Sequence, residues 1–569
     1  MDIPGSTIDY QSALSTQFTP VFSDNVQSLL DVGTISKNPT AIITVNSTAD
    51  VVDDNDSVTT LREAINLANA DNGEDKIVFD RSVFSSAQTI TLTGGELDIT
   101  HNLDIIAPKD SLTGEDLVTV SGNKASQIVE TEPGAPASRV FEIEPGATVT
   151  LSGLIIANGR VLLDNAELSR NNYRVAIDNG GGIKNSGILT LDSSVVRNNA
   201  IPNITLNIAG AGGGIYSTGT LTVSNSTISN NSAGLGGGIY NTGTLTVSNS
   251  IISSNSLFVR ASAAGGGIYN TGTASVLNST LNDNIVSADG GADGGGIFNA
   301  GNLQLSTSTL NNNSSRIGGG IENTNKGTMT VSNSTLSGNT AYDFGGGISN
   351  FGISTVSNST ERGNSAASGG GIYNFGTMTV SNSTLLRNSA SHSITFDANR
   401  GRSGGGIFND GILTLVFSTV TLNSATNGSG VYNNPDAALV RTATANGIGT
   451  VNVSNTIIAS NLLNENGIDP DVLGDFKSSG YNLIGDSTGS TGFGTTGDLV
   501  GTSDNPIDPR LALLDFYGGD TQTVALLPDS PAIDAADPTV LDTDPTTDQR
   551  GFPRYVNGRA DIGAFEFSA

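Results

Sequence analysis

Aromatic side chains recur at one fixed place in this sequence of 569 residues. Each follows the isoleucine of a Gly-Gly-Gly-Ile tetrapeptide, and Lys184, Glu322 and Ser349 interrupt the series. If the isoleucine points into a core, strand alternation points the next residue outward. A row of exposed aromatic side chains could stack on sugar rings or contact a partner, or it could only reinforce a sheet. The candidate ligand-binding residues are Tyr216, Tyr240, Tyr269, Phe298, Tyr373 and Phe408.

Charged residues that could cleave a glycan lie in segments of variable length between these repeats. Paired carboxylates can act as acid and base, and clustered carboxylates can hold Ca²⁺ beside a basic residue. Outward positions within the repeats are Thr, Ser and Asn, so no carboxylate cluster on adjacent repeats can be assembled, which favours solvated loop charges over catalysis. The longest variable segment offers His392, Asp397, Arg400 and Arg402, and nearby segments offer Asp289, Asp293, Arg316 and Asp343.

Two acidic stretches are dense in the oxygen ligands that Ca²⁺ prefers. One is 53–56, and the other contains Asp542, Asp544 and Asp548. Neither matches an EF-hand loop. Asp548 could instead pair with an arginine that follows it. A structural Ca²⁺, the one cofactor that the sequence suggests, and an acidic solvated loop therefore both stay open.

The tetrapeptide marks a repeat whose shortest spacing is 24 residues. A segment of alternating polarity such as 220–223 follows each Gly triplet, and Gly or Asn separates such segments, as expected for short strands joined by tight turns. This unit is too short for a propeller blade and has no helical pattern, so it fits one rung of a parallel β-helix. The triplets start at Gly180, Gly212, Gly236, Gly265, Gly294, Gly318, Gly345, Gly369 and Gly404, with a variant at Gly428.

Two polar columns accompany the strands. Stacked rungs would place like residues about 4.8 Å apart, so the Asn column predicts a ladder of side-chain amides. Extra residues always fall between the Asn column and the next triplet, which places the insertions at one edge of the solenoid. The Asn column is Asn158, Asn198, Asn231, Asn255, Asn284, Asn313, Asn339, Asn364, Asn388, Asn423 and Asn461. The Ser column is Ser193, Ser226, Ser250, Ser279, Ser308, Ser334, Ser359, Ser383 and Ser418.

A solenoid needs covers over its end rungs. Thr60 and Glu63 have the spacing of a capping box, and Leu61, Ile65 and Ala68 share one helical face. The sequence therefore predicts a short amphipathic helix over the first rung.

Composition excludes several classes of protein. The chain has no Cys and only two His, which removes disulfide scaffolds, thiolate metal sites and multi-histidine sites. A net charge of −29 argues against a nucleic-acid partner. The absence of an apolar run of about 18 residues argues against a membrane-spanning helix. The N-terminal residues do not read as a secretory signal peptide, so a signal was removed or export uses another route.

The two flanks resemble known bacterial families. Segments 44–50 and 59–65 resemble the CSLREA domain of surface proteins, with Thr59 where that family carries Cys. Segments 530–534, 548–554 and 561–566 resemble the choice-of-anchor Q domain. The middle resembles repeats of the polymorphic outer-membrane-protein type within the pectin-lyase-like fold. This resemblance implies a right-handed solenoid on a bacterial surface or outside the cell, mostly without a defined reaction.

The sequence thus predicts an all-β chain: a right-handed parallel β-helix with an N-terminal helical cap and a small β-rich C-terminal domain. The expected parts are a linker or loosely docked arm at 1–40, the CSLREA-like cap and first rungs at 41–150, repeats at 151–465 and the C-terminal domain at 466–569. The favoured function is a non-catalytic extracellular rod for adhesion or matrix structure, contacting polysaccharide or surface components through the aromatic row. The alternative is a polysaccharide lyase or hydrolase at the insertion edge. The oligomeric state is left open.

Overall fold

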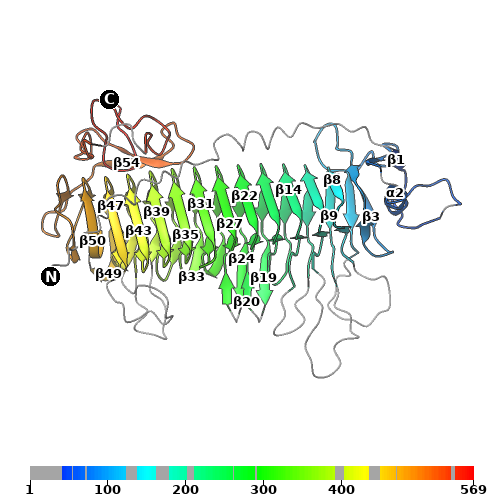
Figure 1. The fold of residues 1–569 in the computed structure, drawn as a ribbon, viewed down its shortest axis with the longest axis horizontal. Helices are drawn as coiled ribbons and strands as arrows, with labels where there is room; N and C mark the ends of the chain where they lie inside the picture. Colours follow the sequence, from blue (N-terminus) through cyan, green and yellow to red (C-terminus); the bar gives the residue numbers. More distant parts are fainter. Residues whose placement is uncertain are drawn as a thin grey trace, which may run out of the picture. The chain divides into compact units, whose positions relative to one another are not determined.

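The computed structural model describes residues 41–568 except 54, 71–72, 124–137, 162–178, 202–209, 260–261, 289–290, 391–402, 435–448, 469–470 and 540–544. Residues 40–569 belong to one compact unit. Within it, short strands pair in parallel with the equivalent strands of the preceding and following rungs (Figure 1). The predicted parallel β-helix is confirmed.

Each full rung contributes one strand to each of three long sheets. Sheet C holds the strand that follows the Gly triplet, sheet A the next strand and sheet B the third. Sheet C comprises β4 (Leu97–Ile99), β7 (Phe141–Ile143), β10 (Ile183–Asn185), β13 (Ile215–Ser217), β16 (Ile239–Asn241), β21 (Ile268–Asn270), β26 (Ile297–Asn299), β30 (Ile321–Asn323), β34 (Ile348–Asn350), β38 (Ile372–Asn374), β42 (Ile407–Asn409) and β46 (Val431–Asn433). Sheet A comprises β1 (Ile42–Val45), β2 (Asp75–Phe79), β5 (Leu103–Ile106), β8 (Thr148–Ser152), β11 (Ile188–Asp192), β14 (Thr220–Ser224), β17 (Thr244–Ser248), β22 (Thr273–Leu277), β27 (Asn302–Ser306), β31 (Thr328–Ser332), β35 (Ile353–Ser357), β39 (Thr377–Ser381), β43 (Ile412–Val416) and β47 (Thr450–Ser454).

Sheet B holds the third strand of each rung, and a shorter sheet D follows it in the rungs from residue 256 onward. Sheet B comprises β3 (Gln88–Thr91), β6 (Val118–Ser121), β9 (Leu154–Ala157), β12 (Val195–Arg197), β15 (Thr227–Ser229), β18 (Ile251–Ser253), β23 (Thr280–Asn282), β28 (Thr309–Asn311), β32 (Thr335–Ser337), β36 (Thr360–Arg362), β40 (Thr384–Leu386), β44 (Thr419–Thr421), β48 (Ile457–Ala459), β51 (Leu483–Ile484) and β53 (Leu499–Val500). Sheet D includes β29 (Ser314–Ile317), β33 (Thr340–Phe344), β37 (Ser365–Ala366), β41 (Ser389–Ala390), β45 (Ser424–Asn427) and β49 (Leu462–Ile468).

The register keeps equivalent residues in columns, so each column has one environment. Ile215 pairs with Ile239 and Tyr216 with Tyr240. The isoleucines are buried, and the residues after them lie on the outer face of sheet C. In sheet A, Leu221 and its equivalents point into the same core. Stacking therefore supplies a continuous apolar core that one rung alone could not bury.

The Gly triplets are required by a close approach between rungs. Gly212 has φ +73°, a conformation that favours glycine. A Cβ on Gly213 would lie 2.6 Å from the carbonyl oxygen of Gly237 in the next rung. Larger residues would push the rungs apart at this corner.

The predicted Asn ladder is present, but its first two positions were wrong by one residue. Asn158 and Asn198 have φ of +57° and +58° and occupy turns. The ladder position in those rungs belongs to Gly159 and Asn199, and Gly159 N–H donates to Asn199 Oδ1 at 2.8 Å. Each Nδ2 then donates to the next Oδ1 through Asn199, Asn231, Asn255, Asn284, Asn313, Asn339, Asn364, Asn388, Asn423 and Asn461.

The Ser column needs the same correction and has a counterpart that was not predicted. Ser194, not Ser193, begins the described ladder, in which a backbone N–H donates to the hydroxyl of the next rung. A further Asn ladder runs between sheets C and A through Asn241, Asn270, Asn299, Asn323, Asn350, Asn374, Asn409 and Asn433.

The predicted N-terminal helix is confirmed as α2 (Leu61–Ala68). Glu63 N–H donates to Thr60 Oγ1 at 3.2 Å, and Thr60 N–H donates to Glu63 Oε2 at 2.8 Å, which completes the capping box. Leu61, Ile65 and Ala68 are buried against the first strands. The helix therefore covers the open end of the core. The described helix is too short and polar to cross a membrane.

Two of the insertions form strands instead of free loops. β19 (Ser256–Val259) and β20 (Ser262–Ala264) pair in parallel with β24 (Ile285–Ala288) and β25 (Gly291–Asp293), respectively. Leu257, Ala263, Val286 and Ala292 form a small apolar cluster between them. Most residues of the other insertions, at 201–211, 390–403 and 433–449, lie outside the described part of the chain.

Parallel strand pairing continues into the range 466–569 that was expected to form the C-terminal domain. β50 (Val472–Gly480) pairs with both β46 and β47, and pairing in sheet B continues to β53, so the solenoid extends past residue 465. The following residues contain the antiparallel pair β54 (Leu511–Asp515) and β55 (Thr523–Leu526) and otherwise irregular backbone. This C-terminal segment packs on the outer face of sheet B, with Ile562 and Ala532 in one apolar cluster with Ile457.

Candidate functional site

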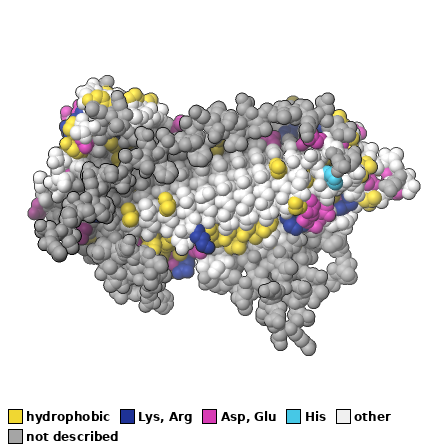
Figure 2. Space-filling model, viewed as in Figure 1, with side chains coloured by type: hydrophobic (Ala, Val, Ile, Leu, Met, Phe, Trp, Pro, Cys, Tyr) yellow, Lys and Arg dark blue, Asp and Glu magenta, His cyan; other side chains and the backbone are white. Residues whose placement is uncertain are grey.

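The outer face of sheet C carries one continuous row of outward side chains, which we call the sheet C row. Register pairing connects every neighbour in it, so the order follows from the fold. Figure 2 shows a band of hydrophobic side chains along the solenoid with acidic and basic side chains gathered near its N-terminal end. From N- to C-terminal rungs the row reads Asp98, Glu142, Lys184, Tyr216, Tyr240, Tyr269, Phe298, Glu322, Ser349, Tyr373, Phe408 and Tyr432.

The first four aromatic rings of the row stack on one another. Ring centroids lie 5.1, 4.8 and 4.7 Å apart from Tyr216 through Phe298, with interplanar angles of 11°, 6° and 9°. This spacing follows from the separation of neighbouring strands, about 4.8 Å. Each inner ring face is therefore covered by its neighbour, so the expected platform for stacking a sugar is not available. What the stack presents outward is ring edges and tyrosine hydroxyl groups.

The tyrosine hydroxyl groups are suited to hydrogen bonding in their neutral form. Tyr216, Tyr240 and Tyr269 are half-buried, and no described residue hydrogen-bonds to their hydroxyl groups. Burial and then the neighbouring tyrosines raise the pKa of Tyr240 to about 12. Burial and then Glu322 raise the pKa of Tyr269. A tyrosine hydroxyl group can both donate and accept a hydrogen bond.

The last two predicted residues of the aromatic row are buried. Tyr373 is 6% exposed and Phe408 is fully buried. Their rings stack with centroids 5.4 Å apart, and Phe344 lies 4.7 Å from Tyr373. Tyr373 Oη also donates to Asp410 Oδ2 at 3.1 Å. The expectation of an exposed row was therefore wrong for these two, because neighbouring side chains cover them.

Between the two aromatic groups, the structure assembles carboxyl groups on adjacent rungs, which the sequence did not allow us to do. Glu322 is 7% exposed, and its Oε2 has no hydrogen-bond partner. Burial and then the nearby Asp293 carboxyl raise the pKa of Glu322 well above its usual range. Burial also raises the pKa of Asp293, against the opposing effect of Arg316.

The arrangement around this pair depends on an inserted strand. Asp293 ends β25 and pairs with Ile317 at the end of β29. Arg316 Nε donates to Asp343 Oδ2 at 2.7 Å, which neutralises the buried Asp343. Asp293, Arg316 and Asp343 were candidates from the sequence, whereas Glu322 stood out only as a break in the aromatic series. The departure of Glu322 from the repeat was the available signal.

A second carboxylate cluster lies at the N-terminal end of the row. Ligand oxygens of Glu96, Asp98 and Glu142 lie within 4.8 Å of one another. Arg139 Nη1 lies 2.6 Å from Glu96 Oε2 and 2.5 Å from Glu142 Oε2, and Lys184 Nζ lies 2.6 Å from Glu142 Oε1. Arg139 and Lys184 therefore already pair with two of the three carboxylates that could hold a metal ion.

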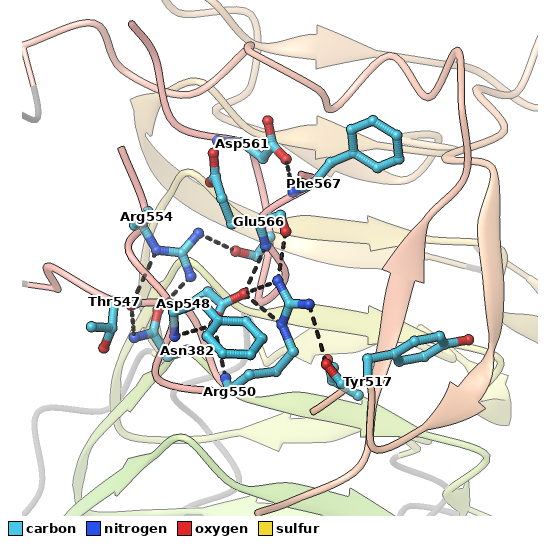
Figure 3. Close-up of polar contacts among 12 residues, drawn as sticks. Asn382, Tyr517, Thr547, Asp548, Arg550, Arg554, Asp561, Glu566 and Phe567 are labelled. Carbon is cyan, nitrogen blue, oxygen red and sulfur yellow. Dashed lines mark hydrogen bonds and ion pairs between the residues drawn. The ribbon is translucent and has the colours of Figure 1, made fainter. Parts of the chain in front are cut away.

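Several predicted site residues cannot be placed. His392, Asp397, Arg400 and Arg402 lie outside the described residues, as do Asp289, Asp542 and Asp544. Asp548 is described and buried, and its Oδ2 lies 2.6 Å from Arg550 Nη2. Backbone N–H groups of Arg550, Phe552 and Glu566 also donate to its two oxygens (Figure 3). These contacts support the ion-pair interpretation of Asp548.

The same network attaches the C-terminal segment to sheet B. The buried Arg554 donates to Asn382 Oδ1 at 2.7 Å and to Gly563 O at 3.0 Å (Figure 3). Its guanidinium lies 4.3 Å from the ring centre of Phe417. Burial lowers the pKa of Arg554 to about 10, which leaves it charged at neutral pH. The Phe417 ring and the neutral oxygen acceptors thus stabilise the Arg554 guanidinium between the C-terminal segment and the solenoid.

Comparison with known proteins adds little to this description. No protein-family profile matches the sequence, and no curated protein matches it. The crystal structure of pectate lyase Pel9A is similar at a TM-score of 0.28 and 13% identity, covering 93% of this chain and 96% of that one. The Dettilon tailspike protein is similar at 0.27 and 14%, covering 79% and 66%. Likeness at this level carries no argument about function, and the resemblance of the flanks stays an expectation.

Proposed function

We propose that this protein is a non-catalytic β-helix rod that binds an extended glycan along the sheet C row. The observation that carries the proposal is the register of Tyr216, Tyr240, Tyr269 and Phe298 on successive rungs. Equivalent groups repeat about every 4.8 Å along the axis. A linear polymer lying along the rod therefore meets the same hydroxyl and ring-edge chemistry at each step.

The rest of the molecule suits a rigid support for such contacts. Two Asn ladders and a Ser ladder connect rung to rung through buried hydrogen bonds, which resists bending between neighbours. This supports a role in adhesion or matrix structure. The extracellular or cell-surface location in a bacterium rests on the resemblance of the flanks alone. The net charge of −29 argues against nucleic acid as the partner.

Replacing the hydroxyl groups while keeping the stack tests this proposal. In a Tyr240→Phe/Tyr269→Phe variant the rings remain but two hydrogen-bonding groups are lost. Each such bond contributes about 0.5–1.5 kcal/mol, so we expect affinity for the bound glycan to fall about 10-fold with an unchanged melting temperature. Tyr342→Phe, which alters a tyrosine 63% exposed on sheet D, is the matched control. Equal affinity of the variant and wild type would reject the row as the binding site.

Glycoside hydrolysis is the second candidate, favoured by the buried Glu322 carboxyl, whose pKa is raised, beside Asp293. A neutral carboxylic acid can protonate a glycosidic oxygen while a second carboxylate activates water or attacks. Because Glu322 is nearly buried, a substrate would have to displace the side chains over it. Release of reducing ends from a polysaccharide panel, lost in both Glu322→Gln and Asp293→Asn, would establish it. Absence of turnover on every polymer that binds would favour the non-catalytic function.

A further inference from the structure

The cations beside the sheet C row are already matched by carboxylates. Arg139 lies within 2.6 Å of Glu96 and Glu142 oxygens, and Lys184 lies 2.6 Å from Glu142. Arg316 lies near Glu322, between the two aromatic groups of the row, and its Nε is 2.7 Å from Asp343 Oδ2. These pairs leave little positive potential for recruiting an anionic polymer.

Among the described residues near the row, the ionisable side chains outside these ion pairs are mainly carboxyl groups. Asp98, next to Glu142 in register, and Asp293, beside Glu322, add such groups at the two ends of the tyrosine stack, and burial raises the pKa of both. Of the described basic residues near the row, the exposed Lys326, in the turn after β30, lies outside these ion pairs. A polyanion lying along the row would bring one charge per sugar toward this surface and would be repelled.

The groups that remain for recognition are uncharged. Tyr216, Tyr240 and Tyr269 present hydroxyl groups at the edge of their stacked rings, and the ring edge of Phe298 continues the apolar band. Hydroxyl groups of a neutral sugar can donate to and accept from such groups without bringing a charge to a half-buried surface.

We infer that the sheet C row selects uncharged glycans and rejects polyuronates and other anionic polymers, with the tyrosine hydroxyl groups as the recognition groups. This inference rests on the proposed function and names its ligand class. It predicts that affinity depends weakly on salt, because no ion pair forms between protein and ligand.

Calorimetric titration of the full chain with matched hexasaccharides tests the inference. The neutral probes are hexamers of cellulose, xylan, mannan and laminarin, and the anionic probes are hexagalacturonate and an alginate hexamer. We expect at least one neutral probe to bind about 10-fold or more tightly than either anionic probe, with less than about a two-fold change between about 20 and about 300 mM NaCl. Tighter binding of an anionic probe would overturn the inference alone, whereas no binding of any probe would overturn the proposed function as well.

A charge variant shows whether the row's own charge sets this selectivity. Glu142→Gln removes the carboxylate from the Lys184 pair, and Lys184 is partly exposed. We expect hexagalacturonate affinity to rise about three-fold or more at low salt, while affinity for the neutral hexamer stays within about two-fold. Unchanged discrimination in this variant would contradict charge as its source.

Discussion

At the scale of single residues, Glu361 breaks the pattern of the core. It occupies an inward position of sheet B, in register between Leu336 and Leu385. The side chain is fully buried, Asn364 Nδ2 donates to Oε2 at 3.2 Å, and Oε1 has no partner. Burial raises the pKa of Glu361 well above its usual range, which favours the protonated carboxyl in the folded protein. An apolar residue would fit this column better.

Replacing Glu361 by leucine is therefore expected to stabilise the protein. The unfolded chain releases the proton of this group near the usual glutamate pKa while the folded chain keeps it, so wild-type stability falls as pH rises from there toward the raised pKa. The Glu361→Leu variant has no such titration. Its free energy of unfolding should therefore exceed that of wild type by more near about pH 8 than near about pH 5, with a gain on the order of 1–3 kcal/mol. Urea unfolding at both pH values measures it. A leucine variant less stable than wild type at both would show that the carboxyl is needed in the core.

At the scale of elements, the buried ladders have a direction and defined ends. The Asn ladder begins where the backbone of Gly159 donates and ends where Asn461 Nδ2 donates to Asp471 Oδ1 at 2.8 Å. The Ser ladder passes through Asn482, whose N–H donates to Asp498 Oδ1 at 2.9 Å. A carboxylate accepts without needing to donate, so it can terminate a chain of donors.

Breaking the ladder in its middle should be costly. Asn313→Ala leaves Asn284 N–H and Nδ2 without their buried acceptor, which should lower the free energy of unfolding by about 2–5 kcal/mol. The control is Asn312→Gly at the neighbouring exposed turn, where φ is +55° and Gly338 takes the equivalent place in the next rung. That change should stay within about 0.5 kcal/mol. Denaturant unfolding of both variants compares them, and equal losses would contradict a special role for the ladder.

At the scale of the whole 40–569 unit, the C-terminal segment explains where the repeat departs from its own pattern. Thr360, Thr384, Thr419 and Ile457 are buried on the outer face of sheet B, although the equivalent Thr227 is half-buried. Thr384 bonds Gln549 at 2.6 Å, and Thr419 bonds the backbone of the segment at 3.0 Å. The segment covers sheet B from β36 to β48 and leaves the stacked tyrosines of sheet C half-exposed.

Attachment of this segment should weaken as pH rises from the usual glutamate pKa toward about 8. Burial and then Asp561 raise the pKa of Glu566 to about 8, so the folded protein keeps a proton that the unfolded chain loses near the usual glutamate pKa. Stability is therefore full below that usual value and falls as pH rises toward about 8. Glu566→Gln keeps an acceptor for Asp561 N–H and removes the titration. As pH rises across this range, the melting temperature of the variant should increasingly exceed that of wild type. A constant difference between the two proteins at every pH would contradict the raised pKa of Glu566.

The sequence predicts the repeated core of this protein well and its candidate site only in part. Gly triplets, alternating strands and a capping box specify rungs, sheets and α2, because each follows from local backbone and patterning rules. Asn158 and Asn198 were wrongly assigned to the ladder because each is followed directly by another Gly or Asn. Only the backbone geometry shows which residue of each pair lies in the turn and which lies in the ladder. The Glu322–Asp293 pair could not be predicted, because the strand pairing of an insertion is not part of the repeat. Burial of Phe408 likewise depends on packing outside the rung.

The central claim is that a neutral glycan lies along the sheet C row. A crystal structure of the full chain with the tightest-binding neutral hexasaccharide tests it most directly. We expect the sugar chain to run parallel to the solenoid axis, with its hydroxyl groups within hydrogen-bond distance of Tyr216, Tyr240 and Tyr269. Sugar density on sheet A, on sheet B or at the insertion edge, with the tyrosine stack empty, would contradict it.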